Sequence, residues 1–130
     1  MSKRDDQTTI QELKDLVTQF SEERGWDRHH TPKNLAVSIA IEAAELMEHF
    51  QWDEYQQNDR DEIAAELADI LAYIFNFAAV MDIDIATTYR EKLKKAVQKY
   101  PVKLFNKDRV GEADFFRIKQ AHRQKKEDKK

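Results

Sequence analysis

Four acidic side chains stand in the two most apolar stretches of this chain. Glu42 and Glu45 are three residues apart in "NLAVSIAIEAAELM", and Glu66 and Asp69 are three residues apart in "ELADILAYIFNFAAVM". Residues three apart on a helix share a face, with roughly 5 to 6 Å between their Cβ atoms. Burying unpaired carboxylates is costly, and four together repel one another. Two acidic pairs in apolar surroundings therefore indicate a chemical role.

Such carboxylates are tolerated when they face solvent, when they meet basic partners or when they bind a cation. Neither apolar stretch contains a Lys or Arg. A single pair is most often a solvated stripe, but the repetition of the pattern favours a cation. Oxygen ligands suit Mg²⁺, with Mn²⁺ as the alternative. A di-iron centre is a weaker reading, because it needs a Glu-x-x-His element and His49 lies four residues after Glu45.

The apolar periodicity predicts helices and no strands, so the expected fold class is all-α. Thr31 followed by Pro32 is a typical helix start, and Pro101 ends the last predicted helix. The four predicted helices run from Thr8 or Thr9 to about Gly25, from Pro32 to about Trp52, from about Asn58 to Met81, and from about Asp84 to Tyr100.

The length of 130 residues suits one helical domain, which we expect over residues 1–105. Residues 106–130 form a basic C-terminal tail. Within it, "EADFFRIKQAHR" is expected to form a short amphipathic helix and "QKKEDKK" a disordered end. The absence of cysteine excludes disulfides and thiolate metal sites.

Charge and hydropathy indicate which partners and which cellular location to expect for the chain. The net charge of −3 predicts little affinity for nucleic acid. No secretory signal is visible, and the apolar runs look too short and too broken by carboxylates to span a membrane, so a cytoplasmic location is expected. The second helix is apolar almost all round. We therefore expect the second and third helices to face another subunit in an obligate homo-oligomer.

The acidic pairs and their flanks resemble a known family. Glu42-Ala-Ala-Glu45, 20 intervening residues and Glu66-Leu-Ala-Asp69 are similar to the ExxE…ExxD signature of the MazG-like all-α nucleoside triphosphate pyrophosphohydrolases. The stretches "RGWDRHHTPKNLAVSIAIEAAELMEHFQW" and "IDIATTYREKLKKAVQKYP" resemble its dCTP pyrophosphatase branch. The resemblance implies an oligomeric four-helix bundle-like fold, a dimer or a homotetramer. It also implies Mg²⁺-dependent hydrolysis of a nucleoside triphosphate to the monophosphate and pyrophosphate.

The same resemblance assigns residues to the site. Glu42, Glu45, Glu66 and Asp69 would hold the metal and carry catalysis, while Lys92 would meet the phosphates. The nucleotide site would be lined by Trp26, His30, Trp52 and Tyr73.

The chain departs from the branch at Ala96, where an Asn is typical, and in lacking most of an arginine run before Tyr100. These differences leave open a non-catalytic helical nucleotide-binding or interaction module. A dUTPase-type or phosphoribosyl-ATP-type pyrophosphohydrolase is the enzymatic alternative to the expected pyrimidine deoxynucleotide house-cleaning.

Overall fold

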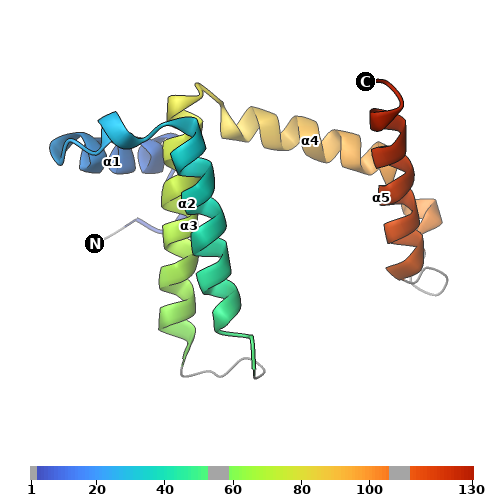
Figure 1. Ribbon diagram of the computed structural model, residues 1–130, viewed down its shortest axis with the longest axis horizontal. Coiled ribbons are helices and arrows are strands. Elements are labelled where there is room, and N and C mark those ends of the chain that lie inside the picture. Colours follow the sequence, from blue (N-terminus) through green and yellow to red (C-terminus); the bar gives the residue numbers. More distant parts are fainter. Residues whose placement is uncertain (1–2, 53–58, 106–111) are drawn as a thin grey trace. The chain divides into compact units, whose positions relative to one another are not determined.

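The computed structural model describes residues 3–52, 59–105 and 112–130. Within these ranges the chain is helical and contains no strand, which confirms the predicted all-α fold class. The α-helices of the described residues are α1 (Ile10–Glu23), α2 (Pro32–Glu48), α3 (Arg60–Val80), α4 (Ile85–Lys99) and α5 (Glu112–Glu127), and all are labelled in Figure 1.

The chain divides into two compact units, Met1–Ile85 and Ala86–Lys130. The first unit holds α1, α2 and α3, and the second holds α5 and nearly all of α4. The domain boundary expected after residue 105 stays a prediction. Because the two units are separate bodies, each is described by itself below.

Local hydrogen bonds define both ends of α1. The Thr9 hydroxyl accepts a bond from the Glu12 amide at 3.1 Å, and the Glu12 carboxylate accepts one from the Thr9 amide at 2.7 Å. This reciprocal pair is a capping box. At the other end Gly25 adopts a φ of +66°, and the amide of Trp26 donates to the Ser21 carbonyl at 2.9 Å. A left-handed glycine of this kind commonly ends a helix, and the predicted bounds of the first helix are confirmed.

The predicted start of α2 is confirmed, but its predicted end is wrong. The Thr31 side chain accepts a bond from the Asn34 amide at 3.2 Å, and Pro32 occupies the first turn. The helix ends at Glu48 rather than near Trp52. Amides just beyond it bond three residues back, as in Phe50 N–H to the Met47 carbonyl at 2.9 Å, and such bonds tighten the last turn. Trp52 consequently lies outside the helix.

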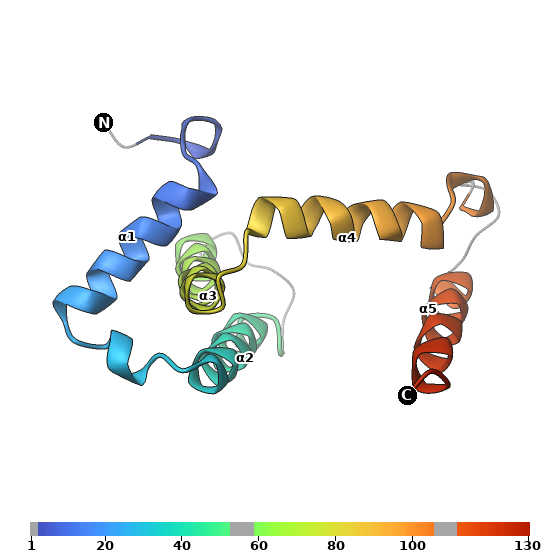
Figure 2. The ribbon, with the colours of Figure 1, turned by 90° about the horizontal axis from the view of Figure 1, so that it is seen from above.

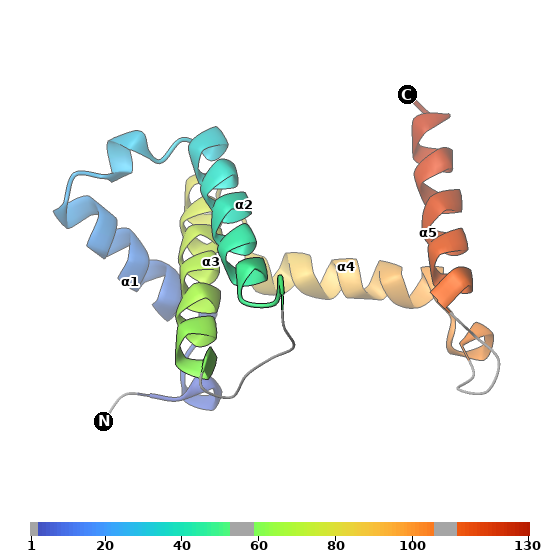
Figure 3. The same cartoon turned by 60° about the horizontal axis from the view of Figure 1, so that its bottom comes forward.

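The helix α3 lies between α1 and α2 and contacts both (Figures 2 and 3). Along α3 the chain runs antiparallel to α2 (Figure 1). The helix starts at Arg60; the predicted cap Asn58 lies outside the described residues. It ends one residue before the expected Met81, where Asp82 adopts a φ of 52°. The ammonium of Lys14 on α1 donates to the Ile83 carbonyl at 3.0 Å, which ties α1 to the end of α3.

Little apolar surface is buried in the first unit. Among the described hydrophobic residues, only Leu35 and Ala78 are fully buried. By length and composition, α3 is apolar enough to cross a membrane, which corrects the expectation that the apolar runs are too short. However, Glu66 and Asp69 lie within α3, and α3 contacts both α1 and α2. The exposed apolar side chains of α2 and α3 support the predicted subunit contact, which stays a prediction.

The second unit is organised around an aromatic cluster. The Tyr100 ring stacks on Phe115 with centroids 5.2 Å apart, and Phe105 meets Tyr100 edge-on at 5.7 Å. The helix α5 continues to Glu127 and so includes the first four residues of "QKKEDKK". The prediction that this whole segment is disordered is therefore wrong. Lys125 and Lys126 lie in its last turn, where positive charge is favourable near the carbonyl end of a helix. The basic end therefore extends the helix.

Candidate metal centre

The antiparallel pairing of α2 and α3 brings carboxylates from both helices together. One oxygen each of Glu42, Glu45 and Glu66 lies within 4.8 Å of the other two. Oxygen ligands about 2.0 to 2.1 Å from Mg²⁺ are themselves only about 3 to 4 Å apart. The acidic cluster, meaning these three glutamates, therefore has nearly the spacing of a cation site.

Two oxygens of the cluster have no partner. Oε2 of Glu42 and Oε2 of Glu66 are buried and form no hydrogen bond with any described residue. Leaving such atoms unsatisfied is unfavourable. A bound cation would satisfy both oxygens. Because carboxylate oxygens are the ligands that Mg²⁺ and Mn²⁺ prefer, the three glutamates fit either ion.

The electrostatics of Glu42 agree with this interpretation. Burial raises the pKa of Glu42, and the hydrogen bond and negative charge of Glu45 raise it further. The charges of Asp69 and Glu66 act in the same direction. A carboxyl with a raised pKa surrounded by carboxylates holds a proton more tightly than usual, and a metal ion would take the place of that proton.

Asp69, the fourth predicted acidic residue, stands apart from the cluster. Its side chain is exposed on α3, and its oxygens are outside the group of three. Its charge nevertheless acts on Glu42, so it borders the site. The structure thus brings together three of the four predicted ligands and leaves Asp69 at the rim.

His49 is a neighbour of the cluster that sequence reasoning considered only as part of a di-iron pattern. Its Nε2 lies 3.7 Å from Oε1 of Glu66, and both side chains are about four-fifths buried. The signal was present in the sequence: His49 lies one helical turn after Glu45, on the face that meets α3. The imidazole therefore lies beside the Glu66 carboxylate at the edge of the acidic cluster.

The residues expected to line a nucleotide lie at several places. Tyr73 is partly buried on α3, one turn past Asp69. Trp52 follows α2 and is 85% exposed. Trp26 packs edge-on against Phe20 before α2, and His30 lines a cavity of about 170 Å³ with residues of α1 and α3. Because the 17 residues of α2 span about 25 Å, Trp26 and Trp52 stand at opposite ends of that length.

A protein-family model, described as MazG-like, matches residues 37–110. The chain belongs to the MazG-like family. The predicted resemblance is confirmed, and the acidic cluster, Asp69, Trp52, Tyr73 and Lys92 all lie within the matched residues.

This MazG-like chain is also similar to individual proteins. It is 32% identical over 104 residues to dCTP pyrophosphatase 1 of Rattus norvegicus, and 29% identical to that of Homo sapiens. Both alignments cover 74% of this chain and 61% of the relative, so the chain spans about three-fifths of the length of these relatives. A crystal structure of a pyrophosphatase from Archaeoglobus fulgidus matches with a TM-score of 0.66 and 36% identity, covering 78% of this chain and 98% of that one.

The family model does not cover the whole of this MazG-like chain. Trp26 and His30 precede residue 37, and α5 begins after residue 110. The acidic cluster is therefore part of what this chain shares with the family model, whereas α5 is not.

Proposed function

We propose that this protein is a Mg²⁺-dependent nucleoside triphosphate pyrophosphohydrolase. It would convert a deoxynucleoside triphosphate and water into the monophosphate and pyrophosphate, with pyrimidine deoxynucleotides as the preferred substrates, as a cytoplasmic house-cleaning enzyme. The observation that carries this proposal is the pair of unpartnered, buried carboxylate oxygens of Glu42 and Glu66, on facing helices of a MazG-like chain. The names of the relatives, dCTP pyrophosphatase 1 and pyrophosphatase, support the reaction class.

The four carboxylates have two tasks in this proposal. Glu42, Glu45 and Glu66 would hold the metal, because their oxygens converge. Mg²⁺ bound there supplies positive charge against the phosphate oxygens and makes water more acidic. Asp69, which lies outside the cluster, is the residue that we assign to accept the proton of the attacking water. His49 positions Glu66 from the end of α2.

The proposed nucleotide contacts require more than one chain. Tyr73 lies one turn from Asp69, and an aromatic ring there can stack on a base. Trp26 and His30, in contrast, precede α2, and the cluster residues Glu42 and Glu45 stand in its second half. We therefore propose a homo-oligomer, a dimer or a homotetramer, in which Trp26 and His30 of one subunit contribute to the nucleotide site of another. Trp52 would complete the base pocket, and a contact of Lys92 with the phosphates stays a prediction from the sequence, because Lys92 lies in the second unit.

A nucleotide panel tests the reaction. Deoxynucleoside triphosphates, dUTP and phosphoribosyl-ATP are incubated with Mg²⁺, and monophosphate and pyrophosphate are separated by chromatography. We expect turnover of at least one pyrimidine deoxynucleotide. Glu45→Gln should lower kcat/KM by at least about 100-fold, because a metal ligand is lost.

A matched control is available on the same helix. Glu48 is exposed on α2, three residues after Glu45, and lies outside the cluster. Glu48→Gln removes the same charge and should keep kcat/KM within about twofold of the original. Equal losses in both variants would contradict the assigned role of Glu45. Binding without turnover of any nucleotide would favour the non-catalytic module, which Ala96 and the missing arginines keep as the second candidate.

A further inference from the structure

The second unit contains a cavity of its own, of about 660 Å³, between α4 and α5. Both helices contribute cations to its wall, and none of the described residues that line it is acidic. The six cations are Lys92, Lys95, Lys99, Lys119, Arg123 and Lys126. We call this cavity the basic pocket.

The basic pocket belongs to the positive part of a strongly divided chain. Residues 86–130 contain 15 Lys and Arg against 6 Asp and Glu, a net charge of +9. Residues 1–85 contain 7 Lys and Arg against 19 Asp and Glu, a net charge of −12, and the two values give the total of −3. The modest net charge of the whole chain therefore conceals a basic unit.

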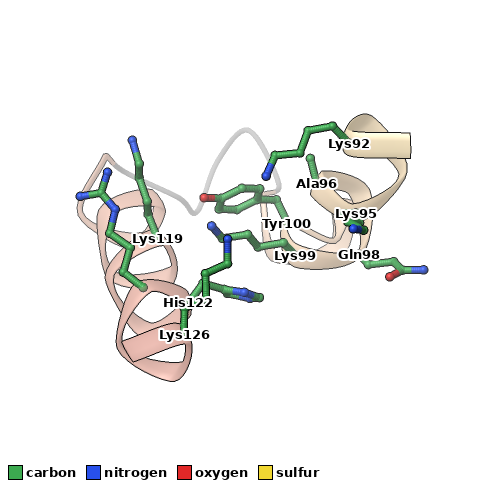
Figure 4. A pocket seen from close by; sticks show the side chains of 10 residues that line it. Lys92, Lys95, Ala96, Gln98, Lys99, Tyr100, Lys119, His122 and Lys126 are labelled. Atoms are coloured by element: carbon green, nitrogen blue, oxygen red, sulfur yellow. The ribbon is translucent and has the colours of Figure 1, made fainter. Parts of the chain in front are cut away.

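The positive charges around the basic pocket are not neutralised. None of the six cations forms an ion pair with any described residue. Figure 4 shows the Tyr100 ring among them, with Lys92 on one side and Lys99 on the other. Desolvation, followed by the charges of Lys99, Lys125 and Lys126, lowers the pKa of His122 in the same wall. Desolvation is the larger cause, and the nearby lysine charges disfavour a protonated imidazole in the same direction.

We propose that the basic pocket binds a polyphosphate anion, either inorganic pyrophosphate or the phosphate chain of a nucleotide, without a metal ion. The volume lies within the range of small-molecule sites, about 300 to 1,000 Å³. Cations from two helices line one cavity that is open to solvent on one side, which suits a compact ligand that carries several charges.

The basic pocket is formed by residues of the second unit, and its chemistry differs from that of the acidic cluster in the first unit. Half of its cations belong to α5, which lies outside the residues matched by the family model. Glutamates can accept a phosphate group only through a metal, whereas lysines and an arginine bind it directly. The proposal does not rest on the proposed catalytic function.

Binding in the absence of divalent metal tests the proposal. Pyrophosphate is titrated into the full chain in EDTA by calorimetry at low and moderate salt, followed by a nucleoside triphosphate. We expect saturable binding that weakens with salt. If the nucleoside triphosphate binds more tightly than pyrophosphate, the ligand is a nucleotide. If it binds equally or more weakly, the ligand is free pyrophosphate.

Two triple variants locate the site. Lys119→Gln, Arg123→Gln and Lys126→Gln together remove the α5 side of the basic pocket and should weaken binding at least about tenfold. Lys125→Gln, Lys129→Gln and Lys130→Gln remove the same charge from residues that do not line it, and should change binding by less than about threefold. Circular dichroism checks that both variants keep their helices. In the original chain, NMR should show a raised His122 pKa on binding, because the anion offsets the nearby lysine charges.

Several results would overturn the proposal. Equal losses in both triple variants would mean diffuse electrostatic attraction. A requirement for Mg²⁺, or loss of the metal-free binding in Glu45→Gln, would place the anion at the acidic cluster. Binding of a single-stranded oligonucleotide at least about 100-fold tighter than pyrophosphate would identify nucleic acid as the ligand. A failed turnover assay alone would leave this proposal standing, because its test uses no metal and no catalysis.

Discussion

At the scale of single residues, Glu42 shows most directly that the acidic cluster lacks a positively charged partner. Its Oε2 is buried without a partner, and the pKa of its carboxyl is raised by burial and then by Glu45. Glu66 has a buried, unpartnered oxygen as well, with His49 3.7 Å from its other oxygen. Leaving these atoms unpaired costs free energy in the folded chain alone, and a bound cation would remove that cost.

The raised pKa of Glu42 makes a prediction about stability and pH. The folded carboxyl keeps its proton to higher pH than the unfolded one, so without metal the free energy of unfolding should fall as pH rises through the raised pKa. Glu42→Gln mimics the protonated form and should raise the metal-free melting temperature at pH 8 but have little effect at pH 4. Thermal unfolding in EDTA measures this.

With divalent metal at pH 8, the original chain should melt at a higher temperature than Glu42→Gln. The original chain should gain melting temperature with Mg²⁺, because a ligand that binds only the folded state stabilises it, whereas the Gln variant should gain little. Glu48→Gln serves as the control and should behave like the original chain at both pH values. A Glu42→Gln variant that melts lower at pH 8 in EDTA would show that the carboxylate stabilises the fold.

At the scale of elements, the helix ends follow from short-range hydrogen bonds. The Thr9–Glu12 capping box starts α1, and Thr31 with Pro32 starts α2. The ammonium of Lys3, followed by the Thr9 amide, lowers the pKa of Glu12 to about 2. The capping bonds of Thr9 and Thr31 join residues three positions apart at each helix start, which is why the starts of α1 and α2 could be predicted.

The capping box can be tested at Thr9. Thr9→Ala removes the hydroxyl that accepts the Glu12 amide and should lower the free energy of unfolding by about 1 kcal/mol in urea titrations. Thr8→Ala is the control: its hydroxyl donates to the Arg4 carbonyl outside the helix, so a change within about 0.5 kcal/mol is expected. Equal effects of the two changes would argue against the cap.

At the scale of the whole molecule, the exposed apolar surface is the main feature. In α3, only 11% of the most apolar 18-residue stretch is buried, and Leu67 and Leu71, one turn apart, are 51% and 39% exposed. Apolar surface exposed to this extent on one helix commonly marks a site of contact with another protein. Self-association through α2 and α3 also agrees with the proposal that residues before and after α2 contact the nucleotide.

Subunit contact through α3 predicts a definite behaviour in solution. The chain should be a dimer or tetramer by light scattering after size exclusion, and Leu67→Glu with Leu71→Glu should yield monomers of lower melting temperature, because charge is then buried in the interface. Leu16→Glu, at a 63% exposed position of α1, should keep the oligomer. A monomeric original chain would refute the interface and the shared nucleotide site together.

The sequence by itself determined the helical class, the starts of α1 and α2, and the acidic pairs. These depend on side-chain period and on bonds between near neighbours, as at Thr31 or between Glu42 and Glu45. Only the tertiary structure decided that Glu66 joins those two glutamates while Asp69 stays at the rim, and that His49 lies against Glu66. It also decided that α2 ends before Trp52, and that α4 and α5 enclose a basic pocket. The reason is physical: spacing along one helix determines which residues share a face, but the packing of helices determines which faces meet.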